Sequence, residues 1–283
     1  MNASRFVLIA ALAAAVPTLA SAQEDTLALG GRTVIVWKPT TAGRHPVIVY
    51  SHGLGGCPTG SRFLTKGLAE RGYLVIAPFH RDAGCRVKKR VAARPSIPFE
   101  QPKRWTDLTY ADRTTDIRAI VGALPSSSLA ASADLNELAV AGHSLGGYTA
   151  LELGGAWSLT RMTEVRAVLA MAPYSEPFLV HGTMSEFAVP VMFQAGVLDR
   201  NITAALGRPG GAFDAARGPK YLVEFQNARH LSWGNKPNAS HEAMLAYAAA
   251  FFDRYLRGAA SDDSVLRNKL AGVAELRGED GSR

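Results

Sequence analysis

The sequence predicts an α/β fold with a mostly parallel central sheet and helices on both of its faces. Two observations lead to this prediction. Short apolar runs, each ended by turn residues, alternate with longer stretches of helical character, which is typical of parallel strands and their crossover helices. One of these runs, at 138–141, leads into a G-x-S-x-G motif at 142–146 and then into an Ala/Leu-rich stretch, which is the strand–turn–helix context that this motif requires.

The predicted elements can be placed in order along the chain. Strands are expected at 33–37, 46–50, 73–78, 138–141, 165–173, 189–196 and 221–225, and helices at 63–70, 111–124, 148–153 and 242–256. No segment repeats with a period of about 20 to 50 residues, which argues against solenoids and propellers. A chain of 283 residues with 47% hydrophobic content can bury one large core, so a single domain is expected.

Residues 1–22 have the features of a signal peptide. Arg5 precedes an apolar run at 6–16, and Ala20-Ser21-Ala22 forms an A-x-A cleavage site. The run is shorter than the ~18 apolar residues that a membrane span needs, so no stable membrane insertion is expected. We therefore expect a secreted or periplasmic protein that is cleaved near Ala22.

The rest of the chain is expected to form a main domain at 23–257 and a C-terminal segment at 258–283. That segment contains a weak helix around 265–270, and the polar residues from Gly278 onward are expected to form a mobile tail.

Ser144, the central residue of the G-x-S-x-G motif, is a candidate nucleophile. A serine of this kind needs a histidine base and an orienting acid, which follow it in the order acid, then histidine. Asp199 comes after the apolar run at 189–196, and His230 comes after the run at 221–225. Both lie at the carboxyl ends of predicted strands, where an open α/β sheet places its chemistry. We therefore predict a triad of Ser144, Asp199 and His230.

Other residues could take these roles. Asp214 lies in a Gly/Ala/Arg-rich loop, Glu224 lies inside a predicted strand, and His241 lies at the start of a predicted helix. Asp199 could also be a turn residue that satisfies its own backbone, and Ser144 could be a solvated serine in an ordinary strand-to-helix turn.

Backbone NH groups are the expected donors to an oxyanion. One is the NH of Leu145, the residue after the candidate nucleophile. The second should come from the glycine-rich turn at 51–56 that follows an earlier strand. Leu54 is the favoured donor in that turn, and Gly55 is the neighbour that could replace it.

The segments at 52–56 (H-G-L-G-G), 72–78 (G-Y-L-V-I-A-P) and 142–148 (G-H-S-L-G-G-Y), together with Asp199 and His230, resemble a known group of proteins. These are the α/β-hydrolases of the dienelactone-hydrolase-like and platelet-activating-factor-acetylhydrolase-like group, and the resemblance spans about 30–257. It implies an α/β-hydrolase fold and cleavage of carboxylic esters through an acyl-enzyme. True dienelactone hydrolases carry a cysteine nucleophile, so the serine argues against that reaction.

The same group includes secreted bacterial cutinase-like polyester hydrolases. Tyr174 falls where those enzymes have an aromatic residue in the acyl cleft, so Tyr174, Leu54 and Trp233 are expected to line the cleft, although Tyr174 could instead pack in the core. Those enzymes often carry Trp before the serine, where this chain has His143, as many lipases do. This difference favours an esterase, with a polyester or cutin depolymerase as the alternative. A non-catalytic binding protein of the same fold is another alternative. A peptidase is less expected, because peptidases of this fold usually have a large second domain.

Cys57 and Cys85 are the two cysteines of the chain. Each follows one of two consecutive predicted strands, and consecutive strands of such a sheet usually lie side by side. In an exported protein the pair is expected to form a disulfide, and two free buried thiols are the alternative.

The formal net charge is +7, and much of it lies in a proline-containing basic insertion at 86–104. This loop either overhangs the cleft or is simply solvated. Its basic run at 86–94 has no interleaved aromatic residues, so no nucleic acid partner is expected. His80-Arg81-Asp82 is similar to a kinase catalytic loop, but the other kinase motifs are missing from the sequence. Arg113, Asp116 and Arg118 are expected to form a charged helix face.

The sequence also suggests which ligands to expect. The histidines show no metal-ligand spacing and the chain has no phosphate-binding glycine loop, so neither a metal nor another cofactor is predicted. The expected partner is a small-molecule or polymeric ester substrate, and the oligomeric state stays open.

Overall fold

The computed structural model describes residues 21–86, 96–258 and 263–280. The predicted signal peptide falls almost entirely on 1–20, outside the described residues, and so does most of the basic run of the 86–104 insertion.

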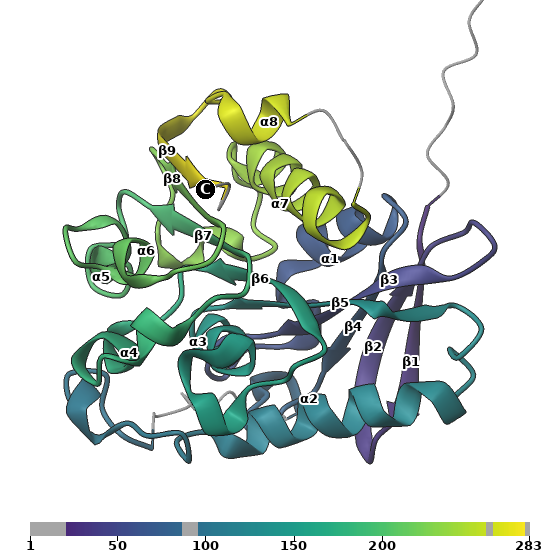
Figure 1. The fold of residues 1–283 in the computed structure, drawn as a ribbon. Coiled ribbons are helices and arrows are strands. Elements are labelled where there is room, and N and C mark those ends of the chain that lie inside the picture. Colours follow the sequence, from purple (N-terminus) through teal and green to yellow (C-terminus); the bar gives the residue numbers. More distant parts are fainter. Residues whose placement is uncertain (1–20, 87–95, 259–262, 281–283) are drawn as a thin grey trace, which may run out of the picture.

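The described part of the chain forms one nine-stranded sheet (Figure 1). In sheet order its strands are β1 (Gln23–Leu29), β2 (Arg32–Lys38), β4 (Leu74–Pro78), β3 (His45–Ser51), β5 (Ala133–His143), β6 (Val165–Met171), β7 (Val191–Gly196), β8 (Lys220–Phe225) and β9 (Val273–Glu279). The strands from β4 to β8 run parallel to one another, whereas β1, β2 and β9 add antiparallel edges. The predicted mostly parallel sheet is confirmed.

Helices cover both faces of this sheet, as predicted (Figure 1). Helices α2 (Ala111–Ala123) and α3 (Leu145–Leu151) pack on one face, and α1 (Arg62–Ala69) and α7 (His241–Leu256) pack on the other. The shorter helices are α4 (Glu176–Val180), α5 (Ala204–Gly207), α6 (Ala212–Ala215) and α8 (Ser264–Arg267).

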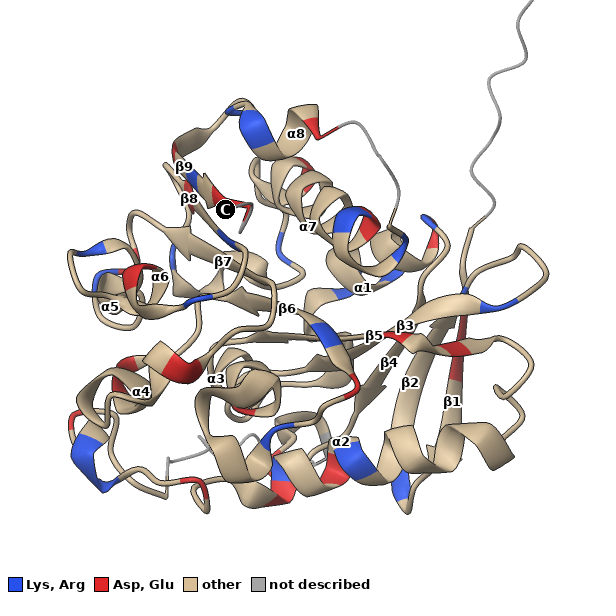
Figure 2. Cartoon of the chain, viewed as in Figure 1, with Lys and Arg blue, Asp and Glu red and all other residues tan. Residues whose placement is uncertain are grey.

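The alternation of side chains along each strand divides the interior into two apolar cores. On β2, Val34 and Val36 belong to the core beneath α2 and α3, whereas Ile35 and Trp37 belong to the core beneath α1 and α7. Lys, Arg, Asp and Glu are scarce along the central strands and common on the outer helices and loops (Figure 2). A sheet buried on both faces explains why its strands are read from the sequence as continuous apolar runs.

Two edge strands, β1 and β9, were not expected from the sequence. Strand β1 is largely polar and is held by pairing with β2 through the turn at Gly30 and Gly31. The expected mobile tail is wrong at its first residues, because Gly278 and Glu279 pair with Tyr221 and Lys220 of β8. An edge strand needs only one buried side, so its sequence carries little of the apolar signal that marks a central strand.

Candidate active site

Ser144 lies in a strained turn between β5 and α3. Its backbone has φ 57° and ψ −118°, a conformation that a non-glycine residue rarely adopts. The flanking glycines are required by close approaches: a Cβ at Gly142 would collide with the carbonyl of Gly146, and a Cβ at Gly146 would collide with the carbonyl of Ser51. The strand–turn–helix context predicted for the motif is therefore present, and the turn presents the Ser144 side chain at the wall of a cleft.

The structure brings Ser144, His230 and Asp199 together. The Ser144 Oγ lies 2.9 Å from His230 Nε2, and His230 Nδ1 lies 2.7 Å from Asp199 Oδ2. Each residue follows the carboxyl end of a parallel strand, with Ser144 after β5, Asp199 after β7 and His230 after β8. Asp199 is almost fully buried, whereas the His230 ring remains partly exposed to the cleft. This arrangement lets His230 accept a proton from Ser144 while Asp199 fixes the position and tautomer of the ring.

The alternative acid and base residues lie elsewhere. The Asp214 side chain accepts a hydrogen bond from the NH of Gly210 and faces Arg277. Glu224 lies in β8 and pairs across the strands with Glu275 of β9. His241 begins α7, where its ring stacks on Phe63 at a centroid separation of 3.7 Å. None of the three contacts Ser144.

His143, directly before Ser144, holds the segment that carries His230. Its Nε2–H donates to the backbone carbonyl of His230 at 2.7 Å, and its ring stacks against Trp233. Burial, together with the nearby His230, lowers the pKa of His143 to about 4. His143 therefore stays neutral and acts as a fixed donor near neutral pH.

A cleft of about 610 Å³ opens beside Ser144 and His230. Most of its wall is apolar, and Leu54, Phe99, Ile202, Leu231 and Trp233 all contribute to it. Leu54 and Trp233 were predicted there. The fully buried Trp233 donates its indole NH to Gln194 at 3.0 Å, so its position in the wall is rigid.

Tyr174 does not line this cleft. Its side chain is only 3% exposed, its hydroxyl donates to the backbone carbonyl of Phe99, and its ring meets Phe99 edge-on. The chain turns inward after β6, where Ala172 has φ 41°. This turn places Tyr174 behind Phe99, in the hydrophobic core. Packing in the core was the alternative considered for Tyr174 in the sequence analysis. Phe99, from the described part of the basic insertion, supplies the aromatic wall instead.

In the glycine-rich turn after β3, the hydrogen bonds favour Leu54 over Gly55 as the candidate donor. The NH of Gly55 donates to Asp82 Oδ2 at 2.9 Å, so it is already committed. Within the described part of the chain, the NH of Leu54 donates to no backbone or side-chain acceptor. Leu145 is the first residue of α3, where backbone NH groups lack an acceptor within the helix. The NH groups of Leu54 and Leu145 therefore both remain candidates for the predicted donors beside Ser144.

Cys57 and Cys85 form the predicted disulfide, with a Cα–Cα distance of 5.8 Å. The bridge joins the turn after β3 to the loop after β4, two strands that lie side by side in the sheet. The NH of Gly84 also donates to the carbonyl of Gly56 at 3.0 Å. Both links tether the turn that carries Leu54.

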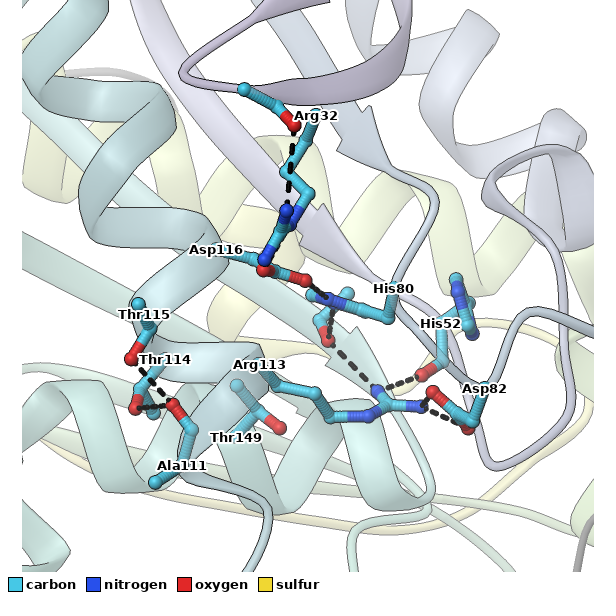
Figure 3. A network of polar contacts seen from close by, with 12 residues as sticks. Arg32, His52, His80, Asp82, Ala111, Arg113, Thr114, Thr115, Asp116 and Thr149 are labelled. Carbon is cyan, nitrogen blue, oxygen red and sulfur yellow. Dashed lines mark hydrogen bonds and ion pairs between the residues drawn. The ribbon is translucent and has the colours of Figure 1, made fainter.

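A buried set of charged residues beneath this turn was not expected from the sequence. His80, Arg113 and Asp116 are buried, and Asp82 is mostly so (Figure 3). The expected charged helix face is therefore wrong for Arg113 and Asp116, which point into the protein. One signal in the sequence could have shown this, because Arg113 lies on the same helical stripe as the core residues Ile117 and Ile120.

In the part of the chain that the structure describes, no group of three or more His, Cys, Asp or Glu side chains could hold a metal ion. None of the described helices is both long and apolar enough to cross a membrane.

Residues 33–119 match the family model of platelet-activating factor acetylhydrolase, isoform II. With the sheet and its helices, this match supports the predicted group. The chain therefore resembles the platelet-activating-factor-acetylhydrolase-like α/β-hydrolases over this part of its length. The matched part of the chain includes Leu54, the disulfide and Arg113, and it ends before Ser144. The family indicates an ester hydrolase. No curated protein matches the chain significantly, and the likeness to cutinase-like enzymes stays a prediction.

Proposed function

We propose that the protein is a secreted serine hydrolase that cleaves carboxylic esters through an acyl-enzyme intermediate. The observation that carries this proposal is the continuous hydrogen-bonded series from Ser144 through His230 to Asp199, beside an apolar cleft. The family match supports the same class of reaction from a different part of the chain.

The proposed reaction has two halves. In the first, the Ser144 Oγ attacks the ester carbonyl as His230 Nε2 takes its proton, and collapse of the tetrahedral intermediate expels the alcohol, which receives that proton from His230. In the second, water attacks the acyl-enzyme with the same help from His230, and the acid is released. Asp199 stabilises the imidazolium that forms transiently in each half.

In both halves the carbonyl oxygen gains negative charge. We assign the NH groups of Leu54 and Leu145 as its donors, since they belong to the two segments that meet at Ser144. Donors that are fixed before the reaction stabilise the developing charge without reorganising, and removing one typically costs ~100-fold or more in kcat.

Export is part of the proposal. The disulfide is typical of an oxidising compartment, and the first strand begins at Gln23, directly after the predicted cleavage site. N-terminal sequencing of the secreted protein tests this, with Gln23 as the expected first residue.

The decisive experiment compares the mature protein with Ser144→Ala and with Ser185→Ala, an exposed serine that serves as the matched control. We expect the wild type and Ser185→Ala to hydrolyse p-nitrophenyl butyrate and to be labelled by a fluorophosphonate. Ser144→Ala should lose the label and lower kcat by ~10⁴-fold or more. Labelling that persists in Ser144→Ala would disprove the nucleophile.

The same assay separates the alternatives. A hydrolase-fold binding protein would show neither turnover nor labelling in the wild type. A series of esters from acetate to octanoate, repeated with a polyester film, distinguishes an esterase from a depolymerase. We expect turnover of the soluble esters.

A further inference from the structure

Arg113 reaches from α2 to the turn that carries Leu54. Its side chain is fully buried. Nη1 donates to the carbonyl of His52 at 2.6 Å and to Ser51 Oγ at 3.2 Å. Nη2 donates to the carbonyl of Gly53 at 3.3 Å. It also donates to both carboxylate oxygens of Asp82, at 2.9 and 2.8 Å (Figure 3). One guanidinium therefore contacts three consecutive residues of the turn and a carboxylate beside it.

The carbonyl of Gly53 is held by several donors at once. Besides Arg113, it accepts from the NH of Gly56 at 2.9 Å and from His52 Nδ1–H at 2.8 Å. This carbonyl belongs to the same peptide unit as the NH of Leu54. Because a peptide unit is planar and its C=O and N–H point in opposite directions, fixing the carbonyl also fixes the direction of the Leu54 NH.

Asp82 holds the next peptide unit. Its Oδ2 accepts the NH of Gly55, so Arg113 and Asp82 together restrain the backbone on both sides of Leu54. Burial opposes ionisation of Asp82, but the Arg113 charge and the Gly55 NH outweigh it and bring the pKa of Asp82 below its usual value. The pair is thus ionic near neutral pH, and both Asp82 carboxylate oxygens accept from Arg113 Nη2.

The other side of the guanidinium is anchored through Ser51. Ser51 Oγ accepts from Arg113 and lies 2.9 Å from His80 Nε2, and His80 Nδ1 lies 2.9 Å from Asp116 Oδ2. Arg32 of β2 also pairs with Asp116. Burial, followed by the Arg113 charge, lowers the pKa of His80 well below its usual value, so the neutral ring donates to Asp116 and accepts from Ser51. The guanidinium therefore cannot shift without disturbing two strands and a helix.

We propose that Arg113, together with Asp82, is a positioning residue that orients the NH of Leu54 toward the oxyanion. This inference rests on the proposed function. Neither side chain lines the cleft, so both act through the backbone of the turn. Because the oxyanion exists only in the transition state and in the tetrahedral intermediates, losing this orientation lowers kcat and leaves KM nearly unchanged.

The test compares Arg113→Gln, Arg113→Lys and Asp82→Asn with Arg254→Gln, which removes an ion pair with Asp263 on the far side of α7. The measurements are kcat and KM for p-nitrophenyl butyrate, the inhibition constant of an alkyl trifluoromethyl ketone, and the melting temperature. The ketone forms a tetrahedral adduct with an oxyanion on the serine, so its affinity reports on the same donors as kcat.

We expect Arg113→Gln to lower kcat by ~10- to 100-fold, with KM within about twofold of the wild type and ketone affinity weakened by a similar factor. Arg113→Lys keeps the charge and should recover part of kcat. Asp82→Asn should fall between Arg113→Gln and the wild type, and it tests the idea even if Arg113→Gln does not fold. Arg254→Gln should change neither kcat nor ketone affinity.

The opposing results are distinct. Folded Arg113 and Asp82 variants that keep wild-type kcat and ketone affinity, with only a lower melting temperature, would show that the pair is merely structural. A raised KM at constant kcat would also overturn the proposal, since it would indicate a role in ground-state binding. Failure of the proposed function itself looks different, because the wild type would then neither turn over the ester nor react with a fluorophosphonate.

Discussion

We expect His143, which directly precedes Ser144, to position the proposed base His230. Its Nε2–H holds the backbone carbonyl of His230 at 2.7 Å, which fixes the base relative to Ser144. We expect His143→Ala to lower kcat by about 10-fold, because misplacing a general base weakens proton transfer. His45→Ala is the control, since His45 makes a similar contact to the carbonyl of Thr41 far from the cleft. Equal kcat values in the two variants would contradict this role.

Glu152 is a buried carboxyl group that the catalytic arrangement does not use. Its burial raises its pKa well above the usual value, which the nearby Thr160 only partly offsets. A raised folded-state pKa gives stability that is present below the unfolded pKa and is lost as the pH rises, at about 1.4 kcal/mol per pH unit up to the folded pKa. Glu152→Gln should therefore raise the melting temperature at pH 8 and do so less at pH 5. A gain that is the same at both pH values would show that ionisation is not the cause.

Individual residues of the candidate site could be predicted where the proposed chemistry requires a sequence motif and a fixed order of residues along the chain. Ser144, Asp199 and His230 could be placed because each follows an apolar strand in a fixed sequence order. Arg113 and Asp82 were missed because their partners, which include the carbonyls of His52 and Gly53 and the NH of Gly55, lie far away in the sequence. The position of Arg113 on an apolar helical stripe indicated its burial but not these contacts. Tyr174 was misplaced for a related reason: a positional analogy does not show which way the chain turns after β6.

The turn between β1 and β2 packs closely against α2, and this contact requires a residue without a side chain at Gly30. Gly30 and Gly31 both have positive φ values, but a Cβ at Gly30 would meet the backbone of Ala119 and Ile120 in α2, whereas a Cβ at Gly31 would meet nothing within 4 Å. We expect Gly31→Ala to cost roughly 1 to 2 kcal/mol from backbone strain alone, and Gly30→Ala to cost clearly more. Urea unfolding of the two variants measures the difference, and equal costs would mean that α2 yields easily.

The disulfide between the turn after β3 and the loop after β4 should matter more for stability than for rate. It closes a loop with a sequence separation of 28, for which chain entropy gives on the order of 3 to 4 kcal/mol. The turn is also held by Arg113, by Asp82 and by the hydrogen bond from Gly84 to Gly56. We therefore expect the Cys57→Ser/Cys85→Ser protein to unfold at clearly lower urea concentration but to keep kcat within about threefold. A large loss of kcat at unchanged stability would reverse this assignment.

The elements themselves were predicted unevenly. Strands that are buried on both faces, such as β5 and β7, stand out as apolar runs, and the helices between them follow from their spacing. Strands β1 and β9 were missed because they lie at the edges and alternate polar with apolar residues over short lengths. Pairing with a neighbouring strand, which is a long-range contact, stabilises such segments more than their own composition does.

The stability of the whole molecule should depend on pH through its buried histidines. Burial and neighbouring charges lower the pKa of His143 to about 4 and that of His52 to about 3, and they also lower that of His80. In the unfolded chain these rings titrate near pH 6.5. Their stabilising contribution is therefore complete above about pH 6.5 and is lost as the pH falls toward the folded-state pKa values.

We expect the free energy of unfolding to fall between pH 7 and pH 5, by up to about 1.4 kcal/mol per pH unit for each of these histidines. The raised pKa of Glu152 has the opposite effect on stability over this pH range, but it is one group, whereas three histidines have a lowered pKa. Urea unfolding at half-unit pH steps measures the slope, and His143→Gln, which cannot be protonated, should flatten it. A stability that does not change across this range would refute the prediction.

Strand β9 decides where the molecule can be shortened. It covers the edge of β8, whose residues Tyr221, Leu222 and Val223 are buried. A protein engineer who trimmed the chain after Leu256, the end of α7, would remove this cover and leave an apolar strand with unpaired NH and C=O groups. Such an edge is a template for other chains, so the shortened protein should aggregate in a concentration-dependent way. Fusion partners and affinity tags placed after β9, by contrast, leave the edge closed.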